Sequence, residues 1–349
     1  MTTIDELIST AQGYVTNGSV PAIQLAVAVD GKTVAFETFG AATDTSRFCI
    51  FSATKPLVAS AIWMLIADGL LDPAQKISMH IPEFAETGLQ PVIIEQVMLH
   101  TAGFPNAPMS YADGADAALR RAQFATWTLE WEPGTRFEYH AGSAHWVLAD
   151  LIDRVTGIDY RDFIETRVTT PLGIQRALGL RDDRQHDIAL LQPVDEVSTS
   201  EGLLAFNTAS VRSAGVPGAG AFMTALELAT MYQGFLHNPG GVWNEAVLVD
   251  ALTNVRCTFT DPLMGAPVNR SLGLVLAGDD GQHILRYAIF GTDCSPRSFG
   301  HAGAHAQIGW ADPESGISFA CLNTAVGSDQ LKGGMRSHRL ATIASKLTL

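Results

Sequence analysis

The sequence is poor in charged residues, and in basic residues above all. Of its 349 residues only 17% are charged, and 22 Lys and Arg stand against 36 Asp and Glu, which gives a formal net charge of −14. Nucleic acids and anionic membranes are bound by clusters of basic side chains. The composition therefore argues against both as partners.

Cysteines and long apolar runs are also scarce. The longest apolar run, Pro56 to Ala67, is too short to cross a bilayer. The first ten residues contain neither the basic stretch nor the apolar stretch of a signal peptide, so we expect a cytoplasmic protein. There is no C-x-x-C pair and no zinc spacing, which predicts reduced thiols. The four cysteines are Cys49, Cys257, Cys294 and Cys321.

Two common hydrolase motifs are absent. The sequence contains no G-x-S-x-G, which excludes the nucleophile turn of α/β-hydrolases at the level of motifs, and no H-E-x-x-H. The remaining composition, with 47% hydrophobic residues, 32 Gly and 16 Pro, is ordinary for a globular enzyme. The length suffices for a large core and for one or two domains.

Strand patterns lie near both ends of the chain and helical patterns lie between them. Residues 23–29 and 33–39 are β-rich and flank Asp30-Gly31, a strong hairpin signal. Further strands are expected at 272–277, 283–290, 306–311 and 317–323. Helices are expected at 115–126, 143–156, 225–237 and 337–347, whereas 192–220 is rich in Ser, Gly and Pro and is expected to be mostly irregular.

This order predicts an α+β (mixed α/β) fold. An antiparallel sheet built from both ends would be flanked by the terminal helices, and the middle would form an all-helical insertion. We expect a discontinuous sheet domain of residues 1–75 and 265–349, a helical domain of residues 76–264, and an active site at their interface.

The segment Ser52-Ala53-Thr54-Lys55 comes just before a helical pattern that is apolar on every face up to Leu71. Such a helix is buried. Ser52 stands where an N-cap residue belongs, and Lys55 follows one turn later on the same face. Pro56 is tolerated because it lies in the first turn.

This pattern suits nucleophilic catalysis. A serine hydroxyl needs a base to take its proton, and a buried lysine with a lowered pKa can do so. The helix N-terminus supplies N–H groups where an oxyanion would form. Taken alone, S-x-x-K is a weak pattern that more often marks a capping serine and a lysine that points to water.

Two other segments could complete a site. Tyr139 ends an extended piece after a Pro-Gly turn, and a tyrosine there can transfer a proton, although it can also be a core residue. The segment from Gly300 to Ala304 leads into a predicted strand, where glycines allow substrate to approach the backbone; it can also be a simple strand entry.

Together these motifs resemble the serine β-lactamase and penicillin-binding-protein superfamily, of the class C β-lactamase type and closest to the family VIII carboxylesterases. The resemblance spans roughly residues 20–325. It is carried by Ser52-x-x-Lys55, Tyr139-x-Ala141 and His301-x-Gly303, with support from Leu99-His100-Thr101-Ala102-Gly103, Pro133-Gly134-Thr135-Arg136-Phe137-x-Tyr139 and Pro171-Leu172-Gly173-Ile174.

The resemblance implies a role for each matching position. Ser52 is the nucleophile that accepts the acyl group, Lys55 and Tyr139 transfer protons, and the N–H groups of Ser52 and Ala304 form the oxyanion hole. The substrate-binding positions would be Ala141, His301, Gly303 and His305. The implied reaction is acylation of Ser52 followed by attack of water, without metal or cofactor.

Two positions depart from the resembled pattern. The asparagine of Y-x-N, which helps to hold an amide side chain of the substrate, is Ala141, and the lysine of K-T-G, which favours a substrate carboxylate, is His301. Histidine is mostly neutral near pH 7. Both changes favour small carboxylic esters over β-lactams or D-alanyl peptides.

Other functions stay open at this point. An amidase or D-aminopeptidase, a β-lactamase-type amide hydrolase or an acyltransferase would use the same acyl-enzyme. A catalytically silent binding scaffold is the alternative outside enzymology. The expected partner is a small ester or amide, and a homo-oligomer is compatible with the sequence.

Overall fold

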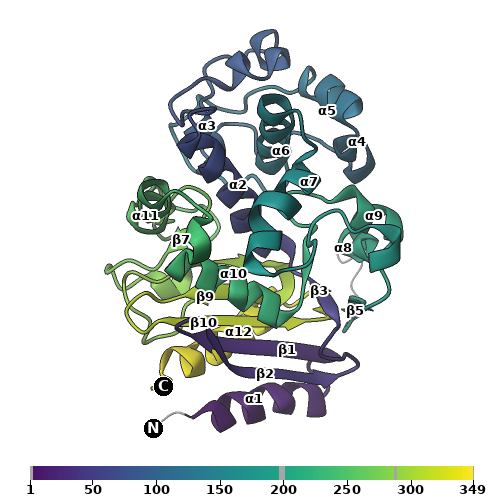
Figure 1. Cartoon of the computed structure of the whole chain (residues 1–349), viewed down its shortest axis with the longest axis vertical. Helices are drawn as coiled ribbons and strands as arrows, with labels where there is room; N and C mark the ends of the chain where they lie inside the picture. Colours follow the sequence, from purple (N-terminus) through teal and green to yellow (C-terminus); the bar gives the residue numbers. More distant parts are fainter. Residues whose placement is uncertain (1–2, 196–200, 287–288, 349) are drawn as a thin grey trace.

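A computed structural model describes residues 3–195, 201–286 and 289–348 of the chain. One end of the molecule is a six-stranded sheet, and helices gather at the other end (Figure 1). The strand order is β2-β1-β10-β9-β8-β7, so the first strands of the chain lie beside the last long strand. Every neighbouring pair in this sheet is antiparallel. This architecture confirms the predicted fold class.

The bounds of the α-helices and strands in the described part of the chain are as follows. The α-helices are α1 (Ile4–Thr16), α2 (Lys55–Ala67), α3 (Ile94–Met98), α4 (Tyr111–Ala115), α5 (Ala117–Phe124), α6 (Ser143–Thr156), α7 (Tyr160–Ile164), α8 (Glu201–Leu204), α9 (Ala209–Ala214), α10 (Ala225–His237), α11 (Glu245–Thr253) and α12 (Gln330–Ser345). The strands are β1 (Ala22–Val29), β2 (Lys32–Gly40), β3 (Arg47–Cys49), β4 (Ile188–Ala189), β5 (Gln192–Pro193), β6 (Phe222–Met223), β7 (Val275–Leu276), β8 (Phe299–Gly303), β9 (Gln307–Ala311), β10 (Ile317–Asn323) and β11 (Ala325–Val326).

The hairpin between β1 and β2 confirms the Asp-Gly turn signal. Asp30 has φ 47° and Gly31 has φ 76°, so both lie in the left-handed region. Asp and Gly tolerate that region, and two such residues in succession give the turn whose twist matches that of the strands. Val29 therefore pairs directly with Lys32.

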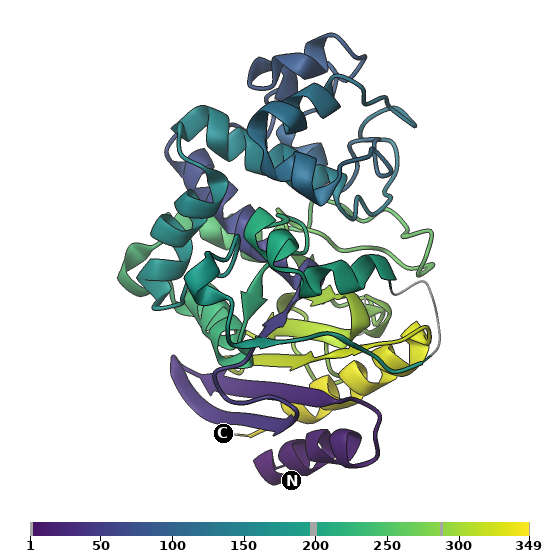
Figure 2. The same cartoon turned by 90° about the vertical axis from the view of Figure 1, so that its right-hand side faces the viewer.

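Helices cover both faces of the sheet. On one face α1 and α12 pack together, with Leu7 and Leu340 in a shared core with Leu25 and Val27 of β1. On the other face α10 packs against β1, β9 and β10, and Ala26 joins the larger core there. Figure 2 shows the helical part of the molecule standing above this second face. A strand that is buried on both faces lacks the polar alternation of a half-exposed strand, as β1 does.

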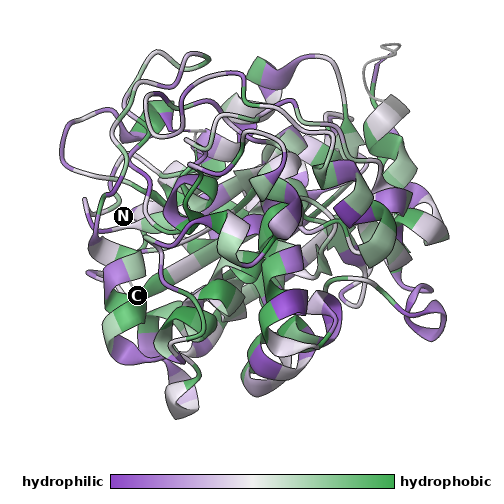
Figure 3. Cartoon of the chain, turned by 90° about the horizontal axis from the view of Figure 1, so that it is seen from above, coloured by the Kyte–Doolittle hydropathy of each residue, from purple (hydrophilic) through white to green (hydrophobic). Residues whose placement is uncertain are grey.

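The middle of the chain is mostly helical, although it is not separate from the sheet. The helix α10 lies within residues 76–264 and packs on the sheet, and β4 and β6 pair with β3. The division at residues 76 and 265 stays a prediction. Seen from above, hydrophobic residues gather along the central helices and strands (Figure 3).

Two predicted strands differ from the structure. The strand expected at 283–290 is wrong, because His283–Leu285 forms a 3₁₀ turn; residues 287–288 lie outside the described chain. The strand expected at 272–277 is only Val275–Leu276. Both differences arise around Arg286. Its buried guanidinium donates hydrogen bonds to the carbonyl oxygens of Pro267 and Ala277, so the chain folds around this side chain and does not extend as a strand.

Two predicted stretches in the middle also differ. The helix expected at 115–126 is interrupted at Asp116, whose ψ is 120° and whose carboxylate accepts hydrogen bonds from the first N–H groups of α5. The stretch 192–220, expected to be mostly irregular, contains α8 and α9; residues 196–200 lie outside the described chain. The Thr208 hydroxyl caps α9, a local signal that the Ser, Gly and Pro content obscured.

No helix in residues 3–195, 201–286 and 289–348 combines the length and the apolar character needed to cross a bilayer. The four cysteines are free thiols, as expected.

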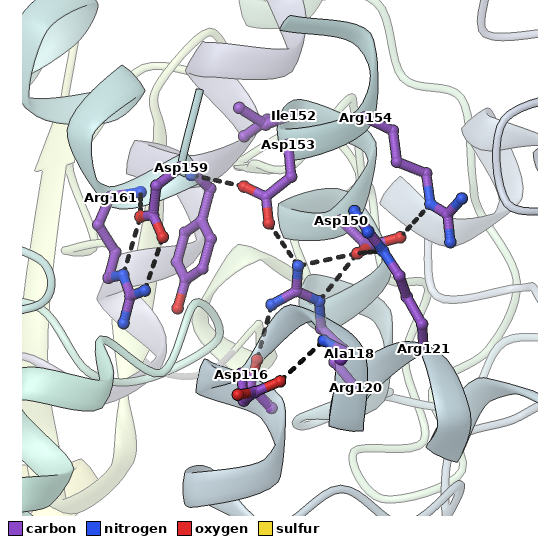
Figure 4. A network of polar contacts seen from close by, with 12 residues as sticks. Asp116, Ala118, Arg120, Arg121, Asp150, Ile152, Asp153, Arg154, Asp159 and Arg161 are labelled. Carbon is purple, nitrogen blue, oxygen red and sulfur yellow. Dashed lines mark hydrogen bonds and ion pairs between the residues drawn. The ribbon is translucent and has the colours of Figure 1, made fainter. Parts of the chain in front are cut away.

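A buried ionic network ties the helices of the middle segment together (Figure 4). The Asp150 carboxylate of α6 is fully buried and accepts hydrogen bonds from Arg120 Nη2 (2.8 Å), Arg121 Nε (3.0 Å) and Arg154 Nε (2.6 Å). Arg154 also binds both oxygens of Glu83 at 2.7 Å. One carboxylate thus joins α5 to α6 and shares with Asp153 the compensation of the buried Arg120 charge.

Replacing Asp150 with Asn should destabilise the protein by about 1–3 kcal/mol, because the buried Arg120 guanidinium loses one of its two carboxylate partners and keeps only Asp153. The free energy of unfolding in urea measures this. The matched control is Asp68→Asn, since Asp68 forms an exposed pair with Arg167 (3.7 Å) whose loss should cost less than about 1 kcal/mol. Equal effects of the two substitutions would show that the network contributes nothing beyond a surface pair.

Candidate active site

Ser52 lies in a tight turn at the entrance of α2. After β3, Phe51 adopts φ 44°, and Phe51–Thr54 forms a 3₁₀ turn before α2 begins at Lys55. The prediction that Ser52 is the N-cap is therefore wrong, because Thr54 occupies that position. In a 3₁₀ helix the side chains at i and i+3 eclipse each other, which places Lys55 directly over Ser52.

The Lys55 amine is enclosed by three oxygen atoms. Nζ lies 3.2 Å from Ser52 Oγ, 2.9 Å from the Ala141 carbonyl oxygen and 2.8 Å from the Gly218 carbonyl oxygen. The side chain of Lys55 is buried, with 1% of its surface exposed, whereas Ser52 is partly exposed. The serine can thus be reached from outside while the amine behind it cannot.

Burial also decides the protonation of Lys55. Desolvation lowers the pKa of the Lys55 amine well below its usual value, and the positive charge of Arg270 lowers it further. Both effects favour the neutral amine. A neutral amine next to a serine hydroxyl can accept its proton.

Tyr139 lies on the other side of this amine. Lys55 Nζ is 4.9 Å from the centroid of the Tyr139 ring. Burial raises the pKa of Tyr139 to about 12, against the opposing influence of Arg270 and of the contact with Ser52. The phenol is therefore protonated at neutral pH and can donate a proton.

Two of the sequence motifs hold Tyr139 in place by binding each other. Gly134 N–H donates to the Thr101 carbonyl oxygen (2.8 Å), and the His140 backbone N–H donates to Nδ1 of His100 (3.2 Å). His100 and Thr101 thus brace the turn that leads to Tyr139. The ring of His100 also lies 4.6 Å from that of Tyr139, centroid to centroid.

The third motif ends strand β8 against the Ser52 turn. A Cβ atom on Gly303 would lie 2.2 Å from the Ile50 carbonyl oxygen, so only glycine permits this approach. The next residue is Ala304, which is partly exposed. The structure thus brings the strand end that carries Ala304 to the turn that carries Ser52.

His301 and His305 differ in what they contact. The His301 ring, 2% exposed, has Nδ1 2.6 Å from the Ala302 carbonyl oxygen and Nε2 3.5 Å from Arg270 Nη1. Burial, followed by the charge of Arg270, lowers the pKa of His301 well below its usual value, so the imidazole is neutral. The His305 ring lies 6.2 Å from that of Phe51, centroid to centroid, and its Nδ1 accepts from Gly327 N–H (3.4 Å). Ala141 is exposed and meets the site through its carbonyl group.

Sequence reasoning missed two contributors. The Gly218 carbonyl comes from the segment expected to be irregular, and a backbone acceptor leaves no signal in the sequence. Arg270 is fully buried, and its guanidinium carbon lies 5.2 Å from the centroid of the Tyr139 ring. Arg270 could have been noticed in the sequence as the only lysine or arginine between Arg256 and Arg286.

The side chains of Ser52, Lys55 and Tyr139 lie together at this point of the fold. Within the part of the chain that the structure describes, no three His, Cys, Asp or Glu side chains are placed to hold a metal ion.

Most of the chain is similar to known proteins. The family described as Beta-lactamase matches residues 7–342. "Esterase/beta-lactamase LipL" of Mycobacterium tuberculosis strain H37Rv is 26% identical over 310 residues, which cover 78% of this chain and 68% of LipL.

Solved structures with the same fold include a family VIII carboxylesterase, with a TM-score of 0.81, 22% identity and coverage of 97% of this chain and 95% of the other. A penicillin-binding-protein homolog from Caulobacter crescentus has a TM-score of 0.80 with the same identity of 22% and the same coverage of 97% and 95%.

Replacing Lys55 with Arg should lower the rate of Ser52 modification by at least about a hundredfold, because the guanidinium cannot accept a proton. In the unaltered protein the rate should rise with pH through the lowered pKa of Lys55, since the neutral amine exists only above that pKa. The rate of labelling by a fluorophosphonate, followed against pH, measures both. Lys32→Arg, on an exposed site of β2, is the control and should leave the profile unchanged. A fully reactive Lys55→Arg protein would remove Lys55 from the base role.

Replacing Gly303 with Ala should destabilise the fold by about 1–3 kcal/mol and slow the labelling of Ser52, because the new methyl group pushes β8 away from the Ser52 turn. Gly334→Ala is the matched control: it adds the same methyl group to α12, where nothing lies within 4 Å. That change should stabilise the helix by about 0.5–1 kcal/mol and leave labelling unchanged. Thermal unfolding and labelling rates give the two readouts, and normal labelling of Gly303→Ala would contradict the close approach.

Proposed function

The chain belongs to the Beta-lactamase family, and from that premise we propose that it is a serine hydrolase that forms an acyl-enzyme on Ser52. The observation that supports this most strongly is the buried Lys55 amine, 3.2 Å from Ser52 Oγ. A neutral amine has two N–H donors and one lone pair. The Ala141 and Gly218 carbonyl oxygens, at 2.9 and 2.8 Å, take the two donors and leave the lone pair for the serine hydroxyl.

Acylation then follows with each proton accounted for. Ser52 Oγ attacks the carbonyl carbon of the substrate while its proton passes to Lys55 Nζ. The negative oxygen of the tetrahedral intermediate is bound by the N–H groups of Ser52 and Ala304. When the bond to the leaving group breaks, Tyr139 donates its proton to the leaving oxygen and recovers one from the Lys55 ammonium.

Deacylation reverses these roles with water in place of the alcohol. The Tyr139–Lys55 pair takes a proton from water as the water oxygen attacks the acyl carbon. The bond between the acyl carbon and Ser52 Oγ breaks, and Oγ is protonated again. The carboxylic acid leaves, and Lys55 is once more a neutral amine.

We infer that the substrates are small carboxylic esters. Ala141 offers no side-chain amide to hold an amide substrate, and His301 is neutral where a charged residue would attract a substrate carboxylate. An ester also has a better leaving group than an amide, so it needs less help with departure. LipL, the relative described above, is named an esterase and β-lactamase, which keeps amide hydrolysis as the competing function.

A fluorophosphonate should modify Ser52 and no other serine, as mapped by mass spectrometry. Ser52→Ala should abolish the adduct. Ser60→Ala is the matched control, since Ser60 is a buried serine of the following helix α2 whose hydroxyl donates to the Leu57 carbonyl oxygen. Labelling elsewhere, or none, would remove Ser52 from the nucleophile role.

Substrate class is decided by comparing p-nitrophenyl esters of short acids, a chromogenic cephalosporin and D-alanyl anilides on the same preparation. We expect the highest kcat/KM for the esters. Faster turnover of the cephalosporin or the anilides would assign amide hydrolysis instead. An acyltransferase would show product ester when an added alcohol competes with water.

A further inference from the structure

Arg270 is a fully buried arginine whose place in the fold is fixed by its backbone. Its N–H donates to the Cys257 carbonyl oxygen (3.0 Å), and its own carbonyl oxygen accepts from Cys257 (3.1 Å) and Arg256 (2.8 Å). These bonds lie just ahead of β7 at the edge of the main sheet. With the main chain held this way, the side chain extends into the candidate site.

The guanidinium contacts the site through aromatic rings. Its carbon atom lies 5.2 Å from the centroid of the Tyr139 ring and 5.5 Å from that of Phe137. Its Nη1 lies 3.5 Å from Nε2 of His301. Because Nδ1 of His301 is 2.6 Å from the Ala302 carbonyl oxygen and donates there, Nε2 is the unprotonated nitrogen and faces the guanidinium.

The arginine is permanently charged, whereas its titratable neighbours are not. A guanidinium keeps its proton in proteins, so its field acts at every pH at which the enzyme works. That field opposes protonation of nearby bases and favours ionisation of nearby acids. The titratable groups whose pKa it lowers are Lys55, His100, Tyr139, His145, Cys257 and His301.

We propose that Arg270 is a positioning residue of this site, which holds the rings of Tyr139 and His301 and supplies the fixed positive charge behind the proton-transfer pair. It acts through these two side chains and not by touching substrate, because it is fully buried. Next to Arg270, Lys55 gives up its proton more readily, and so does Tyr139. The proposal rests on the serine hydrolase function proposed above.

The test compares the pH dependence of Ser52 labelling by a fluorophosphonate in a series of variants. The acid limb is the part of the pH profile where labelling slows as Lys55 becomes protonated. In Arg270→Gln the charge is lost, so this limb should move to higher pH. A move of about one unit makes labelling about tenfold slower at every pH below the limb. Arg270→Lys should behave like Arg270→Gln, because burial at this fully enclosed position favours the neutral amine, as it does for Lys55.

Arg256→Gln is the matched control. It removes an arginine from the neighbouring chain segment, one that pairs with Asp250 (2.6 Å) and Glu95 away from Lys55. Its limb should stay in place. Circular dichroism and thermal unfolding show which variants are folded, and Arg270→Met, which fills the buried space without charge, replaces Arg270→Gln if that protein does not fold.

The outcomes separate this proposal from the hydrolase function. If Ser52 is labelled in the unaltered protein but the limb of the neutral variants stays in place, Arg270 has only a structural role and the proposal is overturned. Absence of Ser52 labelling in the unaltered protein would instead overturn the proposed function itself.

Discussion

The site depends on the burial of a single amine. Lys55 is 1% exposed, and in a medium without water its neutral form is favoured over the ammonium. Three parts of the chain are needed to bury it: the apolar helix α2, the turn that delivers the Ala141 carbonyl group, and the segment that delivers Gly218. Together these parts leave the Ser52 hydroxyl accessible to substrate. They keep the Lys55 amine behind it out of contact with water.

The charged groups around Lys55 differ in sign from the net charge of the whole molecule. The protein has a net charge of −14, yet the groups around Lys55 are an arginine and neutral imidazoles. Burial lowers the pKa of His140 to about 4 and holds His100, His145 and His301 neutral as well. The histidines therefore act as uncharged hydrogen-bonding and packing groups, and Arg270 is the fixed charge among them.

Backbone geometry sets the remaining features of the site. Phe51, at φ 44°, is held in a conformation that few residues other than glycine adopt, and it precedes the nucleophile. Gly303 has room for no side chain against Ile50. Both positions are supported from outside the turn: the Thr54 hydroxyl accepts from Ala221 N–H (3.0 Å), and β8 is paired along its length with β9. The large core behind α2 makes such a strained turn sustainable.

The sequence by itself determined the elements whose signals are local. The Asp30-Gly31 hairpin, the helices at 143–156 and 225–237 and the antiparallel sheet built from both ends follow from periodicity and turn residues, and the structure confirms them. The spacing of Ser52 and Lys55 also brought these two residues together, because three positions amount to one turn in either kind of helix.

Only the tertiary structure decided what surrounds that pair. The carbonyl groups of Ala141 and Gly218 are backbone atoms that any residue carries, so the residue types at these positions do not predict the contacts with Lys55. Arg286 bends a segment that has the alternation of a strand, and Arg270 reaches Tyr139 and His301 from positions 131 and 31 residues away in the chain. Contacts of this kind depend on which buried surfaces pack together, and periodicity within one segment contains no information about its partner.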